Sequence, residues 1–150
     1  MIKTVIGIFW MKNDREKTSM RDRGSVVIIE NKQVLLIQRI SEGSIYYVFP
    51  GGGIENGETP EAGAKREALE ELGVVVKVNE CISEVEFNGT QYFFLAEINS
   101  GTLGTGQGEE YTDENRNRGT YLPMWVDIES LSSMDVRPKE VALKVQTLLN

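Results

Sequence analysis

The sequence of 150 residues contains no histidine. This absence excludes Ser-His and Cys-His nucleophile pairs, as well as zinc sites built on histidine. Any general base must therefore be a carboxylate, a lysine or a tyrosine. Cys81 is the single cysteine of the chain, so no intramolecular disulfide can form. A chain without disulfides suits a reducing compartment, and we expect a cytoplasmic protein.

Positive charge and long apolar runs are also scarce. Lys and Arg number 16 against 23 Asp and Glu, which gives a net charge of −7. This balance argues against general nucleic-acid binding, and we expect no sequence-specific nucleic-acid partner. No segment reaches the ~18 apolar residues of a membrane span, so we expect no membrane partner. An acidic protein can still bind phosphates where a metal cation bridges the two.

The length and the 40% of hydrophobic residues predict one globular domain over residues 1–150. The apolar runs 26–29 and 34–37 flank a polar turn, which predicts a hairpin of strands buried on both faces. Further strands are expected at 46–49, 74–78, 81–98 with a turn at Asn88-Gly89, and 121–126. A closing helix is expected to begin at Pro138 and to bury Val141, Val145, Leu148 and Leu149. The order of elements favours an α+β fold with a mixed-sheet sandwich.

Two segments stand apart from this pattern. Residues 1–20 begin with a short apolar run and lack a small-residue cleavage site, which favours a strand or a packing arm over a signal peptide. Residues 5–11 of this arm could pair with a second chain, so a homodimer is a hypothesis. Residues 100–120 form a long polar loop rich in glycine, and such loops are usually functional or disordered.

The stretch YYVFPGGGIENGETPEAGAKREALEELGVVV, residues 46–76, carries the densest pattern. Thr59 as N-cap, Pro60 as first residue and Gly73 as stop predict a helix over about 60–72. At about 100° per residue, three glutamates share an arc of roughly 100°; they are Glu67, Glu70 and Glu71. The opposite side is expected to form the core face, with Ala62, Leu69 and Leu72. Gly63 and Ala64 are expected on the glutamate face, where their small size leaves room.

A solvated acidic face is the simplest interpretation of this helix. The spacing counts against it, because Glu67 makes like-charge pairs with both Glu70 and Glu71, each unfavourable by about 0.2–0.5 kcal/mol. A hard divalent cation would relieve the repulsion, since Mg²⁺ takes oxygen ligands and leaves positions for water and phosphate. Protonation would relieve it too, because clustered carboxylates raise one another's pKa.

These residues resemble the Nudix hydrolases. The family pattern is a glycine, five residues, a glutamate, seven residues and then REUxEExGU, where U is a bulky aliphatic residue. The chain has Gly52, Glu58 and the run 66–74, so every fixed position agrees, and Ala68 is small where the pattern prefers bulk. The flanking stretches VLLIQR, FPGGG and WVDIESL are similar to the family as well. The resemblance implies an α/β/α sandwich with a mixed central β-sheet.

The same resemblance implies hydrolysis of the pyrophosphate bond in a nucleoside diphosphate linked to another group, with Mg²⁺ or Mn²⁺ as cofactor. Glu67, Glu70 and Glu71 match the metal-binding glutamates, one of which is the candidate general base. The backbone carbonyl of Gly51 is a further candidate ligand. Arg66 and Glu58 match a pair that orients the helix. Candidate contacts to the nucleotide substrate include Gly52 and Gly53.

Other site candidates rest on weaker patterns. Glu110, or its neighbour Glu109, matches a glutamate that many relatives supply from a downstream loop, and the alternative is an acidic loop without a site role. Arg39 ends a strand near the helix and could contact a phosphate, although a plain surface arginine fits as well. Tyr92 lies where dinucleoside polyphosphate hydrolases carry a tyrosine, yet its alternating strand favours packing.

Two functions remain open at this stage. The first is an enzyme, with a nucleoside triphosphate or a dinucleoside polyphosphate as the favoured substrate. The second is a catalytically silent domain that binds a nucleotide as a sensor. Because silent relatives usually lose glutamates of this helix and the chain keeps all of them, the sequence favours the enzyme.

Overall fold

A computed structural model describes residues 21–104 and 120–149 of the chain. The predicted arm at residues 1–20 and most of the predicted polar loop therefore lie outside the described residues. In chain order, the elements are β1 (Arg23–Glu30), β2 (Gln33–Ser41), β3 (Ser44–Val48), β4 (Gly51–Gly53), α2 (Pro60–Leu72), β5 (Val74–Glu86), β6 (Thr90–Gly101), β7 (Thr120–Asp127), the 3₁₀ helix η2 (Ile128–Ser133), β8 (Val136–Arg137) and α4 (Lys139–Thr147).

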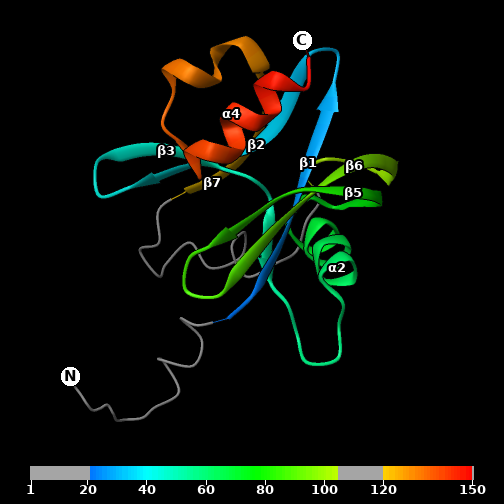
Figure 1. Ribbon diagram of the computed structural model, residues 1–150. Coiled ribbons are helices and arrows are strands. Elements are labelled where there is room, and N and C mark those ends of the chain that lie inside the picture. The colour runs from blue at the N-terminus through cyan, green and yellow to red at the C-terminus, as the bar shows by residue number, and fades with distance from the viewer. Residues whose placement is uncertain (1–20, 105–119, 150) are drawn as a thin grey trace, which may run out of the picture.

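Strand β1 is the centre of the mixed sheet. It runs parallel to β6 and antiparallel to β2 and β4, and the sheet continues in the order β5-β6-β1-β2-β3-β8, with β7 on β2. Helix α2 packs on β1 and β5, whereas α4 packs on η2 and β8 (Figure 1). The predicted α/β/α sandwich with a mixed central sheet is confirmed.

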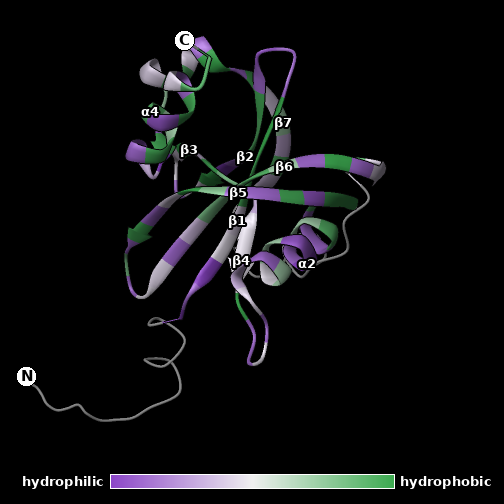
Figure 2. Cartoon of the chain, turned by 45° about the vertical axis from the view of Figure 1, so that its right-hand side comes forward, coloured by the Kyte–Doolittle hydropathy of each residue, from purple (hydrophilic) through white to green (hydrophobic). Residues whose placement is uncertain are grey.

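Side chains alternate between two cores along the central strands. In β1, Val27 points to the core under α4, and Val26 and Ile28 point to the core under α2. In β2, Leu36 belongs to the α4 side and Leu35 to the α2 side. This alternation explains the continuous apolar runs of the sequence, because both faces of a central strand are covered. Figure 2 shows α2 with more hydrophilic than hydrophobic colour, although one side of it faces the sheet.

The two predicted hairpin turns are confirmed by their backbone conformation. Asn31 and Lys32, between β1 and β2, have φ of 53° and 63°. Asn88 and Gly89, between β5 and β6, have φ of 52° and 107°. Between β1 and β2 the pairing ends at Glu30 and Gln33, so the turn has two residues, and positive φ at both is what a type I′ turn requires. Between β5 and β6 the pairing ends at Glu86 and Thr90, so that loop has three residues.

The predicted core faces of both helices need correction. In α2, Ala62 and Leu69 are exposed, the latter by 50%, and the buried face contains Ala64, Ala68 and Leu72. The helix is turned so that part of its glutamate side, including Glu71, faces the sheet. The prediction placed the core face by the largest apolar residues and therefore chose the wrong side of the helix.

Helix α4 differs from the prediction at both ends. Pro138 is its N-cap and not its first residue, and Val141, Ala142 and Val145 are buried. Leu148 and Leu149 are exposed by 40% and 43%, because the helix ends at Thr147 and no longer holds them on the buried stripe. Within the described ranges, no helix is both long and apolar enough to cross a membrane.

Candidate active site

Helix α2 is held very close to strand β1 at its N-terminal end. The Thr59 side-chain oxygen accepts a hydrogen bond of 3.1 Å from the backbone N–H of Ala62 and so caps the helix. A Cβ atom on Gly24 of β1 would lie 2.8 Å from the backbone oxygen of Pro60 and 3.0 Å from the nitrogen of Ala64. The absence of a side chain at Gly24 therefore permits this approach. Gly63 and Ala64 are buried in the contact and do not leave open space above the glutamates.

Arg66 connects the carboxylates of this region. Its Nε donates to Glu58 Oε2 at 2.7 Å, and Nη2 donates to Glu58 Oε1 at 3.1 Å and to the backbone oxygen of Gly53 at 2.9 Å. Its Nη1 donates to Glu67 Oε2 at 3.1 Å and reaches both Glu70 oxygens at 3.3 Å. Arg66 and Glu58 thus contact each other as the resemblance implies, and their pair ties the helix to the loop before it.

The charges shift the pKa values of this pair in opposite directions. The hydrogen bonds from Arg66, followed by one from the backbone N–H of Glu55, lower the pKa of Glu58 from 4.5 to about 2. The hydrogen bonds to Glu58, and then those to Glu67 and Glu70, raise the pKa of Arg66, with burial acting against them. Both groups are therefore ionised at neutral pH, and one cation offsets part of the charge of several carboxylates.

The three predicted glutamates differ in burial. Glu71 is buried, with 5% of its surface exposed, and its Oε1 accepts a hydrogen bond of 2.9 Å from the backbone N–H of Gly51. The Glu67 side chain is 14% exposed and lies against Gly52, where a Cβ atom would come within 2.2 Å of its carboxylate carbon. The Glu70 side chain is 49% exposed. The glutamate side of α2 therefore runs from a buried carboxylate to a half-exposed one.

The donor set fits a hard divalent cation. Among residues 21–104 and 120–149, no group of three or more acidic side chains is arranged to enclose an ion as it stands. Glu67 and Glu70 instead bind Arg66, and Glu71 binds Gly51. Yet the donors of α2 are carboxylate oxygens, which Mg²⁺ and Mn²⁺ prefer.

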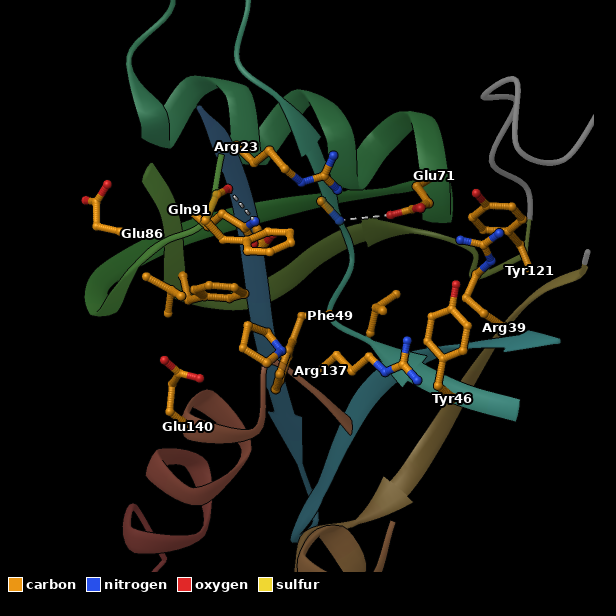
Figure 3. A pocket seen from close by; sticks show the side chains of 17 residues that line it. Arg23, Arg39, Tyr46, Phe49, Glu71, Glu86, Gln91, Tyr121, Arg137 and Glu140 are labelled. Carbon is orange, nitrogen blue, oxygen red and sulfur yellow. Dashed lines mark hydrogen bonds between the residues drawn. The ribbon is translucent and has the colours of Figure 1, made fainter. Parts of the chain in front are cut away.

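A cavity of about 700 Å³ lies between the two helix layers, and Glu71 is part of its lining. Figure 3 shows α2 along one side of it and α4 on the other, with Arg39 and Tyr121 on the same side as Glu71 and Gln91 on the opposite side. The residues that line it are Arg23, Ser25, Arg39, Tyr46, Val48, Phe49, Gly51, Glu71, Val85, Glu86, Phe87, Gln91, Phe93, Tyr121, Arg137, Pro138 and Glu140.

The predicted site residues fall into three groups. Gly51, Glu71 and Arg39 line the cavity. Gly52, Gly53, Glu58, Arg66, Glu67 and Glu70 gather at the loop and helix beside it. Tyr92 packs in the core under α2, where its ring stacks on Phe94 with centroids 6.4 Å apart, and it does not line the cavity. Glu110 lies outside the described residues.

The sequence prediction did not assign site roles to Arg23, Tyr121 or Arg137. Tyr121 is the strand partner of Arg39, and Arg137 comes from the short strand β8. For Tyr121, the signal that could have found it is the alternation of β2 and β7, which places Arg39 and Tyr121 on one face once the register is known. Periodicity within one strand does not reveal its partner strand, so the pairing stays hidden at the sequence level.

Comparison with known proteins identifies the class. The NUDIX domain family model matches residues 20–144, and the chain therefore belongs to the Nudix hydrolase family. It is 31% identical over 131 residues to the 8-oxo-dGTP diphosphatase of Haemophilus influenzae, which covers 82% of this chain and 88% of that protein.

Two further matches differ in extent. A MutT-like protein of Streptomyces ambofaciens is 44% identical over 55 residues, so that the match spans 37% of this chain and about a third, 34%, of that protein. Among solved structures, a NUDIX hydrolase from Nitrosomonas europaea is similar with a TM-score of 0.64 at 18% identity, covering 86% of this chain and 88% of that chain. At 18% identity this similarity shows a shared fold and says nothing of the substrate.

Proposed function

We propose that the protein is a metal-dependent pyrophosphohydrolase that cleaves a nucleoside diphosphate linked to another group. The observation that carries this proposal is the position of Glu71, a buried carboxylate of the glutamate helix that also lines the cavity of about 700 Å³. That volume falls in the range of small-molecule sites, which run from about 300 to 1,000 Å³. Family membership and the substrate of the Haemophilus relative, 8-oxo-dGTP, support a nucleotide as the ligand.

In the proposed reaction, water attacks one phosphorus of the pyrophosphate link and the bridging P–O bond breaks. Two phosphate products leave, one of them a nucleoside monophosphate. Mg²⁺ or Mn²⁺ held by Glu67, Glu70 and Glu71, with the carbonyl of Gly51, would polarise the phosphoryl oxygens and make hydroxide accessible near neutral pH.

The remaining side chains position this centre. Arg66 holds Glu67 and Glu70 on one side of the helix and joins them to Glu58 and the backbone of Gly53. Such outer contacts orient metal ligands and are typically worth about 10–100-fold in metal affinity or activity. Gly52 lets the chain pass against the carboxylate of Glu67, and Gly53 lets it pass against the side chain of Arg21. Gly52, Gly53 and, in the cavity, Arg39 are the proposed substrate contacts.

The proposal is tested by hydrolysis of a panel of nucleoside diphosphate derivatives with Mg²⁺, with Mn²⁺ and with EDTA, and with chromatographic separation of the products. Release of a nucleoside monophosphate that depends on the metal supports the enzyme. Tight nucleotide binding without turnover across the panel would refute it and favour a sensor that uses the glutamates for binding alone.

A further inference from the structure

Four side chains form a continuous row across one face of the sheet, at the end of strand β2. Arg39 lies directly opposite Tyr46 of β3 and directly opposite Tyr121 of β7 in the strand pairing. Arg137 of β8 reaches over the ring of Tyr46 from the next strand. We name Tyr121, Arg39, Tyr46 and Arg137 the arginine–tyrosine row.

Cation and ring alternate along the row. The guanidinium carbon of Arg39 is 3.8 Å from the ring centroid of Tyr121 and 5.8 Å from that of Tyr46. The guanidinium carbon of Arg137 is 4.1 Å from the ring centroid of Tyr46. All three distances are within the ~6 Å over which a cation is attracted to a ring face. Both guanidinium groups are therefore within the attraction of a tyrosine ring, which favours their position in the row.

Every member of the row lines the same cavity as Glu71. Figure 3 shows the row along one wall, with Arg39 between Tyr121 and Tyr46 and with Arg137 beyond Tyr46. A chain of net charge −7 thus places two arginines, with Tyr46 between them, along the lining of the cavity that Glu71 also lines.

The orientation of Arg137 has a second support. Its Nε donates to Asp135 Oδ1 at 3.1 Å and its Nη2 to Oδ2 at 2.9 Å. These bonds use two of the five N–H donors of a guanidinium, which leaves others for a ligand. A guanidinium held in a fixed plane matches the geometry of a phosphate, which it can bind through two parallel hydrogen bonds.

We propose that the arginine–tyrosine row is a binding site for a phosphate group of the substrate that lies outside the two phosphates shared with a nucleoside diphosphate sugar, with Tyr46 and Tyr121 as positioning residues. This inference rests on the proposed function and narrows it to nucleotides that carry a further phosphate, as opposed to nucleoside diphosphate sugars. A stacked nucleobase is the competing occupant of such a wall. It fits less well, because a guanidinium already lies over each tyrosine ring and would have to be displaced.

The first test compares substrates that share a base and differ in charge, namely UTP with UDP-glucose and GTP with GDP-mannose. We expect kcat/KM to be at least tenfold higher for the triphosphate in each pair. Arg137→Gln and Arg39→Gln should reduce this ratio at least fivefold, chiefly through KM. Tyr46→Phe should keep the ratio and Tyr46→Leu should lose it, because the ring and not the hydroxyl holds the cations. Lys144→Gln, which removes the same charge outside the cavity, is the control.

The second test measures binding of inorganic triphosphate to the full chain by calorimetry in the presence of EDTA. We expect Kd to rise at least fivefold in Arg137→Gln and to stay unchanged in Lys144→Gln. This readout needs neither metal nor turnover, and Arg137 is exposed, so the variant should fold even if Arg39→Gln does not.

The two proposals fail differently. Metal-dependent turnover with equal rates for triphosphates and sugars, and no effect of Arg137→Gln on either measurement, would overturn the row as a phosphate site and leave the pyrophosphohydrolase intact. Absence of turnover for these four compounds and for the whole panel of nucleoside diphosphate derivatives, with triphosphate binding that Arg137→Gln weakens, would support the row and refute the enzyme.

Discussion

The two helices that cover the sheet are attached to it in different ways. Helix α4 buries Val141, Ala142 and Val145 in a core of large apolar side chains, which includes Phe49 and Phe93. Helix α2 buries mainly small residues and one carboxylate, and polar contacts tie it to the loop that precedes it. On the α4 side the rings of Phe49 and Phe93 pack edge to face with centroids 5.7 Å apart, whereas α2 approaches the sheet most closely at Gly24.

This difference suggests that α4 serves mainly the stability of the fold and that α2 serves mainly the chemistry of the site. Apolar packing is non-directional and tolerates shifts, so it suits a helix whose task is to close a core. Hydrogen bonds and close backbone contacts fix orientation, which suits a helix that must hold carboxylates at set positions. We therefore expect substitutions in α2 to change activity and substitutions in α4 to change stability.

The largest expected effect is the loss of turnover in Glu71→Gln. The amide oxygen of glutamine can still accept the hydrogen bond from Gly51, so the fold should persist, while the lost charge removes a metal ligand. We expect a reduction of about 100-fold or more in metal-dependent kcat/KM, equivalent to about 2.7 kcal/mol. Glu61→Gln, on the exposed first turn of the same helix, is the matched control and should change the rate little. An unchanged rate in Glu71→Gln would contradict the assignment.

A smaller effect is expected where α2 approaches β1. Gly24→Ala places a methyl group against backbone atoms of Pro60 and Ala64, which cannot rotate away. Overpacking of this kind costs about 2 kcal/mol, and urea unfolding measures it. In the control Gly63→Ala, the two nearest atoms are side-chain atoms of Glu58 and Ile54 at 3.2 Å, and the Ile54 Cα atom lies at an ordinary 3.6 Å, so the change should stay below about 1 kcal/mol. Equal unfolding midpoints for wild type and Gly24→Ala would show that the close contact is not limiting.

On the α4 side, Val145→Ala should lower the free energy of unfolding by about 1.5 kcal/mol, because two buried carbon groups are removed from a fully covered position. Activity per folded molecule should stay the same. Leu143→Ala, at a position exposed by 46%, should have almost no effect on either quantity. A drop in kcat for Val145→Ala without a drop in stability would contradict the assignment of stability to α4 and activity to α2.

The smallest effect concerns pH and the Glu58–Arg66 pair. The folded-state pKa of Glu58 is depressed to about 2 from 4.5, so ionised Glu58 stabilises the native state. That contribution is full above about pH 4.5 and is lost as the pH falls through about 2. The difference in urea midpoint between wild type and Glu58→Gln should therefore be present at pH 7 and shrink towards zero near pH 2. A difference that stays constant over this range would place its origin outside the ionised pair.

Much of the fold and of the glutamate helix could be predicted from local pattern. The bounds 60–72, the Thr59 cap and the Gly73 stop depend on residues within one helix, and the two hairpin turns depend on two residues each. The orientation of α2 could not be predicted, because it depends on a contact with Gly24, a residue 36 positions before Pro60. The arginine–tyrosine row could not be predicted either, because its members are far apart in the sequence. Tyr121 and Arg137 reach Arg39 and Tyr46 only through strand pairing.

The burial of β1 on both faces has a consequence for how its register is chosen. A slip by one residue would exchange Val26 and Ile28 with Val27, and apolar side chains would still fill both cores. Burial of apolar side chains therefore distinguishes only weakly between the observed register of β1 and the register shifted by one residue. Gly24 discriminates strongly, because the neighbouring Arg23 or Ser25 would bring a side chain against Pro60. The same alignment pairs Ser25 with Gly51, whose N–H holds Glu71, so one glycine in a strand sets where a carboxylate of the helix can lie.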